Sequence, residues 1–460
     1  MGEFGRDPDS LRVYRTQMRC LSHVHESMSR GIAVNKARVI EGATLYQGKM
    51  DVAEKIARAY CGWPINLNSD EQLKVVLYEQ EGLPVQKHRE SRKPTTDADA
   101  IAALRGRFLA FDPEEDPSPE TTLARISDGA HPLIESRVLY ANAEQCISHY
   151  ITPLVVRDAS GAVSGIRDRV HHTISLHSQK NARWSYTDPP LAQLPDDLED
   201  LYEPDPDWPW FGFDWDQIEL IEVAAECKDP TLLNALRNGW DVHTMSTVAM
   251  FALPAPPTYK DPHFSAECAA WREQVRWQGK TDPRRVYCKR RNHRKSYGGT
   301  ARKAGSIPGT RTLGITPALS IQMDHRYEAL FPGLAVWQRE FVAEAMKRGE
   351  TRTWYGRRRR YLAKKGTYKK GEMLDHPMQG GVQEIAMLTF LEIKDTHGPR
   401  TYFAYGKHDS QWWAIHRSQW GITEDIKRIV TQPRNIRGEM IPFPATFKSR
   451  GYEEASNVAA

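Results

Sequence analysis

Residues 284–299 read RRVYCKRRNHRKSYGG, a stretch with seven basic residues and no acid. If this stretch is an α-helix, one face carries four residues spaced four apart: Arg285, Lys289, His293 and Tyr297. From the first to the last of them, the side-chain direction turns by only about 120° around the helix axis. Two cations and two rings on one face could hold a polyphosphate with its attached base, since the cations would lie along the phosphates and a ring would stack on the base. The other basic residues point elsewhere and are expected to form a solvated face: Arg290, Arg291, Arg294 and Lys295.

Three acids could act together with such a helix, although each also has an ordinary explanation. Asp214 ends the apolar stretch 210–213, which reads as a buried strand, and Glu219 lies in the first turn of a helix predicted over 217–227. The ordinary explanation for Glu219 is that an acid in the first turn stabilises a helix, because it offsets the positive end of the helix dipole. Asp409 lies in the turn of a hairpin predicted from 401–405 and 412–415, where Asp is a common turn former.

The charge of the chain is nearly balanced but unevenly distributed. Across 460 residues, 63 Lys and Arg stand against 59 Asp and Glu, which gives a net charge of +4. Nine basic residues and no acid lie between Arg284 and Lys303, and eight more basic residues lie between Arg357 and Lys370, whereas residues 196–207 contain seven acids. This segregation suits a polyanionic partner that approaches from one side.

Several classes of protein are disfavoured by the composition. The six cysteines form no Cys-x-x-Cys pair and no tight cluster with histidine, so neither a zinc module nor a disulfide framework is indicated. No apolar run approaches the roughly 18 residues of a membrane span, and no signal peptide opens the chain. We therefore expect a soluble, intracellular protein without a membrane partner, for which the cytoplasm of a bacterial cell or a phage-infected host and an organelle all remain open.

The hydrophobic pattern predicts helices around a shorter region of strands. Helices are expected over 10–63 with a break at Gly31, over 101–111 and 133–150, and through most of 232–430, with loops at 252–262 and 305–316. Strands are expected between 155 and 176. The acidic, Pro-rich stretch 188–209 reads as a surface connection.

In this order, the three constellations resemble the signature motifs of the polymerase I-like family A DNA polymerases. Residues 214–220 match motif A, the Arg285, Lys289 and Tyr297-Gly298 series matches motif B, and His408-Asp409 matches motif C. Further segments match the family in the expected order: Ile65–Ser69 with Gln72-Leu73, Pro94–Asp97, Ala182-Arg183, Leu191–Pro195, Asp241–Thr244, Phe331–Gly333, Thr353–Arg359 and Pro377–Gly380. The resemblance extends over nearly the whole chain.

The resemblance implies an α+β right-hand polymerase fold, with an antiparallel sheet in the palm and mostly helical fingers and thumb. It divides the chain into an N-terminal segment and thumb over 1–154, a first part of the palm with motif A over 155–245, fingers with motif B over 246–375, and a second part of the palm with motif C over 376–460. No exonuclease unit is recognisable, because the thumb resemblance begins near residue 10.

The implied activity is template-directed addition of dNTPs to a primer 3′ end, with release of pyrophosphate. Asp214, Asp409 and the backbone carbonyl of Trp215 would hold two Mg²⁺ ions, for which Mn²⁺ can substitute, and Lys289 would also give a proton to pyrophosphate. Nucleotide contacts would come from Arg285, Lys289, His293, Tyr297, Glu219, Gln217 and His243. Primer-template DNA would contact Arg183, Gln193, Arg357, Arg358, Gln379 and His408. We expect a monomer; the sequence identifies no processivity factor.

Three positions depart from the family pattern. His293 replaces the usual Phe or Tyr, which puts an imidazole where a ring would stack on the incoming base. Ser410 replaces the Glu that commonly follows the motif C Asp and removes one charge near the metals. Asp375 replaces a common Asn beside template and primer, where a carboxylate is electrostatically unhelpful unless it is paired.

Two alternatives remain open from the sequence. The series His408-Asp409-Ser410 is also the form of motif C in phage-type single-subunit RNA polymerases, although those enzymes have a small residue where this chain has Glu219. The second alternative is an inactive polymerase fold that only binds duplexes. The intact acids of motifs A and C, together with the motif B cations, argue against it.

Overall fold

A four-stranded antiparallel sheet lies at the centre of the computed structural model, which describes residues 7–109, 117–299, 307, 310, 313–361, 370–407 and 409–452. The strand order is β11 (Thr401–Lys407), β12 (Ser410–Ile415), β8 (Trp210–Trp215) and β15 (Ala445–Arg450). All three pairings are antiparallel. The predicted strand at 210–213 and the predicted hairpin are confirmed, and so is the α+β class.

Helices that cover this sheet come from both ends of the chain. They are α1 (Pro8–Arg30), α7 (Ile218–Cys227), α14 (Lys370–His397) and α15 (Thr423–Thr431). The Ser27 hydroxyl of α1 donates to the Ala404 carbonyl in β11, which ties the first helix to a strand nearly four hundred residues away. Glu222 of α7 lies directly against Gly381 of α14, where an added Cβ would overlap the carboxyl group. A glycine is therefore required at this crossing.

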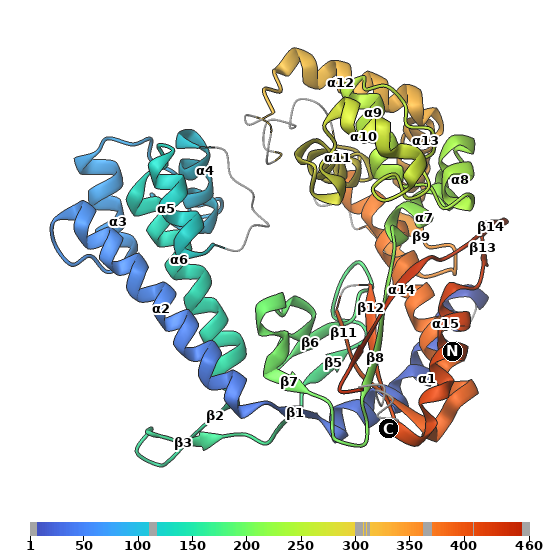
Figure 1. Cartoon of the computed structure of the whole chain (residues 1–460), viewed down its shortest axis with the longest axis horizontal. Helices are drawn as coiled ribbons and strands as arrows, with labels where there is room; N and C mark the ends of the chain where they lie inside the picture. The colour runs from blue at the N-terminus through green and yellow to red at the C-terminus, as the bar shows by residue number, and fades with distance from the viewer. Residues whose placement is uncertain are drawn as a thin grey trace, which may run out of the picture.

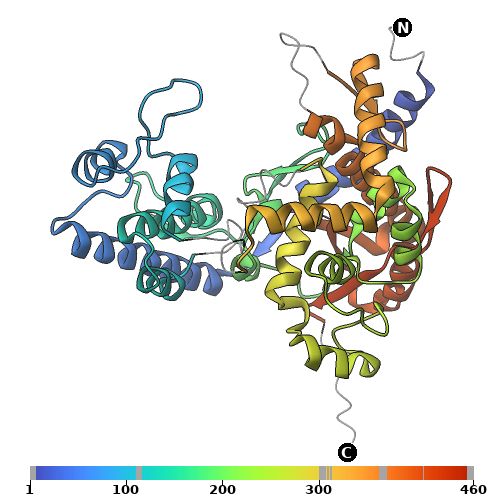
Figure 2. The ribbon, with the colours of Figure 1, turned by 90° about the horizontal axis from the view of Figure 1, so that it is seen from above.

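Two groups of helices rise from the sheet on opposite sides (Figure 1). One group, the N-terminal arm, consists of α2 (Lys36–Cys61), α3 (Asp70–Lys74), α4 (Ala98–Phe108), α5 (Pro119–Ser127) and α6 (Pro132–Cys146). The other, the helical lobe, consists of α8 (Pro230–Arg237), α9 (Val242–Phe251), α10 (Ala269–Val275), α11 (Pro283–Ser296), α12 (Pro317–Leu330) and α13 (Pro332–Arg348). Seen from above, the arm again lies apart from the rest (Figure 2).

Smaller strands connect these parts. A three-stranded sheet has the order β4 (Arg169–Val170), β1 (Ile32–Val34) and β7 (Tyr202–Glu203). Four two-stranded pairs are formed by β2 (Val155–Arg157) with β3 (Val163–Ile166), β5 (Thr173–Ser175) with β6 (Ser185–Thr187), β9 (Glu350–Arg352) with β10 (Arg358–Arg360), and β13 (Arg434–Ile436) with β14 (Glu439–Ile441). The strands expected between 155 and 176 are thereby confirmed.

The apolar core has separate parts that follow this arrangement. The largest cluster joins the sheet, its helices and most of the lobe. The arm has its own cluster, around Leu77, Leu104 and Leu139. A third, small cluster within the lobe contains Val248, Cys268, Trp271 and Trp277. Among the described residues, no helix is long and apolar enough to cross a membrane.

The acidic stretch 188–209 differs from the prediction of a surface connection. Leu191, Leu194, Leu198 and Leu201 are all buried in the main cluster. Short 3₁₀ turns place every third or fourth residue on the core side, while the acids between them face outward. The abundance of Pro and Asp concealed this apolar periodicity in the sequence.

Gly212 in β8 allows the two central strands to pack closely. A Cβ at this position would lie 2.5 Å from an atom of the Trp412 ring on the paired strand. We predict that Gly212→Ala lowers the free energy of unfolding by about 1–3 kcal/mol, the usual cost of overpacking a core. The midpoint and slope of urea unfolding measure the change.

Gly165→Ala is the matched control for this substitution. Gly165 also lies in a strand, β3, but has no atom within 4 Å of an added Cβ. Its substitution should change stability by less than about 0.5 kcal/mol. Equal effects of the two substitutions would contradict the packing explanation.

Candidate active site

Strand register brings Asp214 and Asp409 together. Asp214 is the penultimate residue of β8, and it pairs with Ser410, the first residue of β12. Lys407 and Ser410 close the β11–β12 hairpin, so Asp409 lies in the turn beside the end of β8. The two carboxyl groups lie close enough for the charge of Asp409 to raise the pKa of Asp214. Two acids separated by almost two hundred residues thus share one edge of the sheet.

The electrostatics of the two acids show that they share a site. Partial burial raises the pKa of Asp214, and the charges of Asp409 and Asp216 raise it further, to about 6, although Lys448 opposes the shift. Burial also raises the pKa of Asp409. Two carboxyl groups that resist ionisation side by side are a favourable environment for a cation with oxygen ligands such as Mg²⁺. The donor set therefore fits the metal that the sequence implied.

One face of α11 carries the cations and rings of motif B. The helix begins at an Asp282 cap with Pro283 in its first turn and ends at Ser296, so the helix assumed for this stretch is present and Tyr297 is its C-terminal cap. On this face Lys289 and His293 are exposed, whereas Arg285 and Tyr297 are partly buried. The rings of His293 and Tyr297 lie 5.9 Å apart between centroids.

The opposite face of α11 corrects one expectation. Arg291 was predicted to lie on a solvated face, but its side chain is only 2% exposed. It donates to Asp324 at 2.6 Å and to the Tyr287 hydroxyl at 2.8 Å, so it anchors α11 to α12. Lys295 is also largely covered and pairs with Glu328 at 2.8 Å. Acids on α12, distant in sequence, therefore neutralise the inner side of the basic helix.

Glu219 is a hub that connects three parts of the chain. Its Oε2 lies 2.7 Å from Nε2 of His293 and accepts a hydrogen bond from the Tyr297 hydroxyl at 3.3 Å. Its Oε1 accepts from Gln379 at 2.8 Å and from Arg183 at 3.2 Å. Burial would raise the pKa of Glu219, but the hydrogen bond and charge of His293 outweigh it and the net shift is downward.

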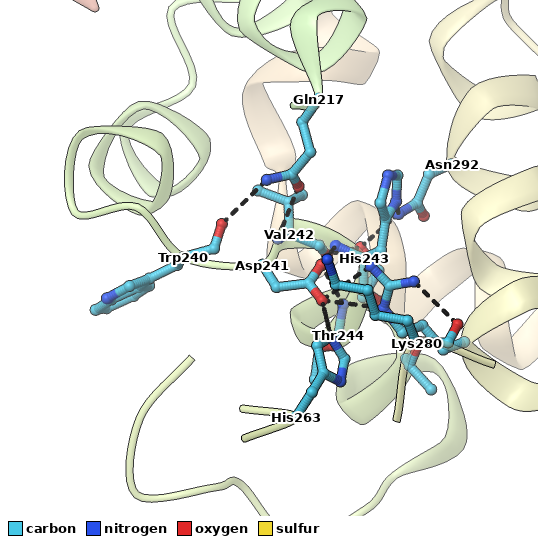
Figure 3. Close-up of polar contacts among 12 residues, drawn as sticks. Gln217, Trp240, Asp241, Val242, His243, Thr244, His263, Lys280 and Asn292 are labelled. Carbon is cyan, nitrogen blue, oxygen red and sulfur yellow. Dashed lines mark hydrogen bonds and ion pairs between the residues drawn. The ribbon is translucent and has the colours of Figure 1, made fainter. Parts of the chain in front are cut away.

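Asp241 is a second hub, on the inner side of α11 (Figure 3). Its carboxylate caps α9 through the backbone N–H groups of His243 and Thr244. The same carboxylate accepts from Nε of Arg285 at 3.0 Å and lies 2.8 Å from Nε2 of His263. Burial would raise the pKa of Asp241, but the hydrogen bond from His263 and the charge of Arg285 hold it well below its ordinary value.

His243 lies beside this hub as a neutral imidazole. Burial lowers its pKa to about 3, and the nearby charges of Arg285 and Lys289 act in the same direction. The Asn292 amide donates to Nδ1 of His243 at 3.1 Å, so the ring proton is on Nε2. A neutral N–H donor therefore stands next to the motif B cations.

The remaining predicted residues have more varied surroundings. Gln217 binds the backbone of the next loop, through Trp240 and Val242, and so joins the starts of α7 and α9. Gln193 and Arg183 line a pocket that also includes Asp409. Arg357 pairs with the buried Glu384 at 2.7 Å, and Arg358 lies 3.8 Å from Asp7. His408 lies outside the described residues. The predicted DNA contacts of these residues stay predictions.

Four residues of the site have contacts that no sequence pattern predicts: Asp241, His263, Asn292, and Trp277, whose indole donates to His263 at 3.1 Å. Of these, Asp241 belongs to the family segment 241–244. The sequence signal for Asp241 was its position before Val242-His243-Thr244, which is that of a helix cap. His263 and Trp277 lie in a loop-rich segment without periodicity, so no pattern pointed to them.

Comparison with known proteins agrees with this geometry. Residues 113–262 match the sequence model of DNA polymerase family A. The thermostable DNA polymerase I of Thermus aquaticus is 27% identical over 366 residues, and DNA polymerase I of Bacillus subtilis is 24% identical over 384 residues. These matches cover 76% and 80% of this chain but only 36% and 37% of the relatives. The chain thus spans about a third of their length.

A solved structure shows the same fold. The POL domain of Pol1 from M. smegmatis, in complex with DNA primer-template and dNTP, superposes with a TM-score of 0.69 at 21% sequence identity. The match covers 94% of this chain and 69% of that chain. The right-hand polymerase fold expected from the sequence is confirmed by this similarity.

The repulsion between Asp214 and Asp409 should limit the stability of the metal-free protein. An acid whose pKa is raised on folding favours the folded state at low pH, and this contribution is lost as pH rises from about 4 to about 6. We predict that Asp409→Asn raises the melting temperature at pH 8 in EDTA and that the gain disappears at pH 4. Mg²⁺ should stabilise the original protein more than the variant.

Asp128→Asn is the control, since Asp128 is an exposed acid at the end of α5 in the arm. Its melting temperature should follow that of the unmodified protein at both pH values. A gain from Asp409→Asn that is the same at pH 4 and pH 8 would show that like-charge repulsion is not its cause.

Proposed function

We propose that this chain is a family A DNA polymerase, which extends a primer 3′ end on a DNA template with dNTPs and releases pyrophosphate. The observation that carries the proposal is the meeting of Asp214 and Asp409 at the sheet edge. The cationic face of α11 adds groups suited to a triphosphate. Positioning and charge neutralisation are most of what phosphoryl transfer requires from a protein.

The two acids supply the metal ligands in this proposal. Asp214, Asp409 and the backbone carbonyl of Trp215 would hold two Mg²⁺ ions, and these ions would supply activation of the attacking oxygen and charge neutralisation at the leaving group. Ser410 contributes no carboxylate, and its hydroxyl donates to the Lys407 carbonyl within the turn. Its replacement of an acid therefore leaves the hairpin intact and the two principal ligands in place.

The α11 face binds the nucleotide. Arg285 and Lys289 neutralise the triphosphate, and Lys289, which is exposed, also protonates the leaving pyrophosphate. His243 adds a neutral N–H donor near the phosphates. Glu219, held by Arg183 and Gln379, lies where its bulk excludes a 2′-hydroxyl, and Tyr297 lies next to it.

Primer-template DNA occupies the side of the sheet on which Asp409 lies. Arg183 and Gln193 line the pocket next to Asp409, so they can contact the primer end. Gln379 and His408 are further contacts in this proposal. Arg357 and Arg358 supply positive charge near the backbone, although both also face acids of the protein. Such contacts give strong salt dependence and little sequence preference.

Removal of either acid should abolish extension. We predict that Asp214→Ala and Asp409→Ala each reduce the rate of single-nucleotide addition by at least about a thousandfold, since each removes a metal ligand. Rapid-quench assays with a labelled primer measure the rate. Asp128→Ala is the control and should extend normally. Near-normal extension by either active-site variant would overturn the assignment.

Sugar selection distinguishes the proposal from its alternatives. The chain should prefer dNTPs over rNTPs and should require a primer, because Glu219 is in place beside Tyr297. Efficient rNTP incorporation on promoter DNA without a primer would favour a phage-type RNA polymerase. Tight duplex binding without any incorporation would favour an inactive scaffold.

The contact of His293 with Glu219 should weaken nucleotide binding. The His293 imidazole lies 2.7 Å from Glu219, and this pair competes with stacking on the incoming base. We predict that His293→Phe lowers the KM for dNTP by about fivefold, equivalent to about 1 kcal/mol. Because an imidazole can gain a charge on acidification and a phenyl ring cannot, the KM of the unmodified protein should rise at lower pH, whereas that of the variant should show no such rise.

His293→Gln is the matched variant, since an amide can still donate to Glu219 but cannot replace the ring. Its KM should be higher than that of the unmodified protein. If both substitutions leave the KM and its pH profile unchanged, the His293 ring does not contact the nucleotide.

A further inference from the structure

A buried chain of polar contacts lies behind the nucleotide face of α11. The indole Nε1 of Trp277 donates to Nδ1 of His263 at 3.1 Å, and Nε2 of His263 lies 2.8 Å from Oδ2 of Asp241. The same oxygen accepts from Nε of Arg285 at 3.0 Å. Figure 3 shows the His263 ring directed at the Asp241 carboxylate. The chain of contacts thus leads from the interior of the lobe to a cation of motif B.

The Trp277 contact determines where the proton of His263 lies. An indole N–H can only donate a hydrogen bond, so Nδ1 of His263 must be the acceptor. In the neutral ring the proton is then on Nε2, where it is donated to Asp241. The side chain of His263 is only 2% exposed, and its ring lies nearly coplanar with that of Trp277, with 10° between the planes and 6.1 Å between the centroids. Both the tautomer and the orientation of the ring are therefore fixed.

Asp241 is left with little freedom by its donors. Its Oδ1 accepts from the backbone N–H groups of His243 and Thr244. Its Oδ2 accepts from the Thr244 hydroxyl at 2.7 Å, in addition to His263 and Arg285. A carboxylate has about four acceptor positions, so this one is saturated. Loss of the His263 donor would leave a buried charge to be compensated mainly by Arg285.

Arg285, whose side chain is 12% exposed, retains N–H groups for an anion. The guanidinium has five N–H groups. The group on Nε and one of the two on Nη2 face Asp241, and one of the two on Nη1 donates to the Lys280 carbonyl at 3.3 Å. Within the described part of the chain, the remaining N–H groups of Nη1 and Nη2 have no acceptor. These two form the end-on fork of the guanidinium, which matches a phosphate in a bidentate contact. Asp241 therefore aims this fork.

The segment that carries His263 and Trp277 forms a small core of its own. Trp277 packs against Trp271 at 5.2 Å between centroids, and Cys268 and Val248 complete the cluster. The Arg284 guanidinium lies over the Trp277 ring at 5.6 Å. This core holds no residue of the predicted site, yet it sets the position of the His263 imidazole beside Asp241.

We propose that His263 is a positioning residue that acts through Asp241 to orient Arg285 for the triphosphate, with Trp277 fixing the tautomer that this requires. The identity of the anion as a nucleotide triphosphate rests on the proposed polymerase function. The contact chain itself does not, because a polyphosphate of any origin would meet the same fork.

Binding of inorganic tripolyphosphate to the full chain, measured by calorimetry, tests the proposal directly. His263→Phe keeps an aromatic ring beside Trp277 but removes the donor to Asp241 and the acceptor for the indole, and it should weaken binding by about tenfold, the lower end for loss of an outer-shell partner. Trp277→Phe should also weaken tripolyphosphate binding. His263→Gln can place an amide N–H near the former Nε2, and it should restore affinity to within about threefold of the original.

Trp271→Phe is the matched control. It removes an indole from the same small core, one that donates to the Pro254 carbonyl at 2.7 Å and not to His263. It should lower the melting temperature about as much as Trp277→Phe while leaving tripolyphosphate affinity unchanged. If Trp271→Phe weakens binding equally, or if His263→Gln is no better than His263→Phe, the effect is general destabilisation and the proposal is wrong.

Primer extension separates this inference from the proposed function. With active protein, His263→Phe should raise the KM for dNTP by about tenfold while kcat and the Kd for primer-template stay within about threefold. If the original protein binds tripolyphosphate but extends no primer, the function fails and the positioning role is still tested by calorimetry. If it binds no tripolyphosphate, or if His263→Phe binds it as well as the original, the inference fails.

Discussion

The pairing of β8 with β12 is the constraint on which the rest of the site depends. Because Asp214 stands opposite Ser410, the turn that follows β11 places Asp409 beside it. A shift of one residue would turn Asp214 to the other face of the sheet, since side chains alternate along a strand. Gly212 permits the Trp412 ring to lie against β8, and Trp413 is fully buried on the same strand. Close packing thus fixes the register, and the register positions the acids.

A second principle is that acids of the protein hold the site cations in place. Asp241 holds Arg285 from behind, and Glu219 binds both Arg183 and His293. These contacts reduce the conformational freedom that the side chains would otherwise lose on binding a ligand. The two acids leave their cations in different states. Among the described residues, Asp241 leaves two N–H groups of Arg285 without an acceptor, whereas Glu219 contacts His293 on the side of the helix that faces the predicted nucleotide.

The motifs could be predicted from sequence because their chemistry is local. The four-residue spacing from Arg285 to Tyr297 gives one helix face wherever the helix lies, and the end of an apolar strand followed by Asp214 is visible in a few residues. Partners that are set by tertiary packing could not be read in this way. Arg291 was expected in solvent because its acid, Asp324, is 33 residues away on another helix. His263 lies in an irregular loop, so only the folded chain shows that it meets Asp241.

The surroundings of Asp375 are a further example of a feature that only the folded chain shows. A carboxylate there was expected to repel DNA unless it was paired. Burial raises its pKa, and the charges of Glu219 and Glu372 act in the same direction, against Arg359 and Arg183. A raised pKa means that the surroundings make this carboxyl group more costly to ionise than an exposed acid. The buried position of Asp375, which no local sequence pattern indicates, thus opposes the negative charge that was expected to be unhelpful beside DNA.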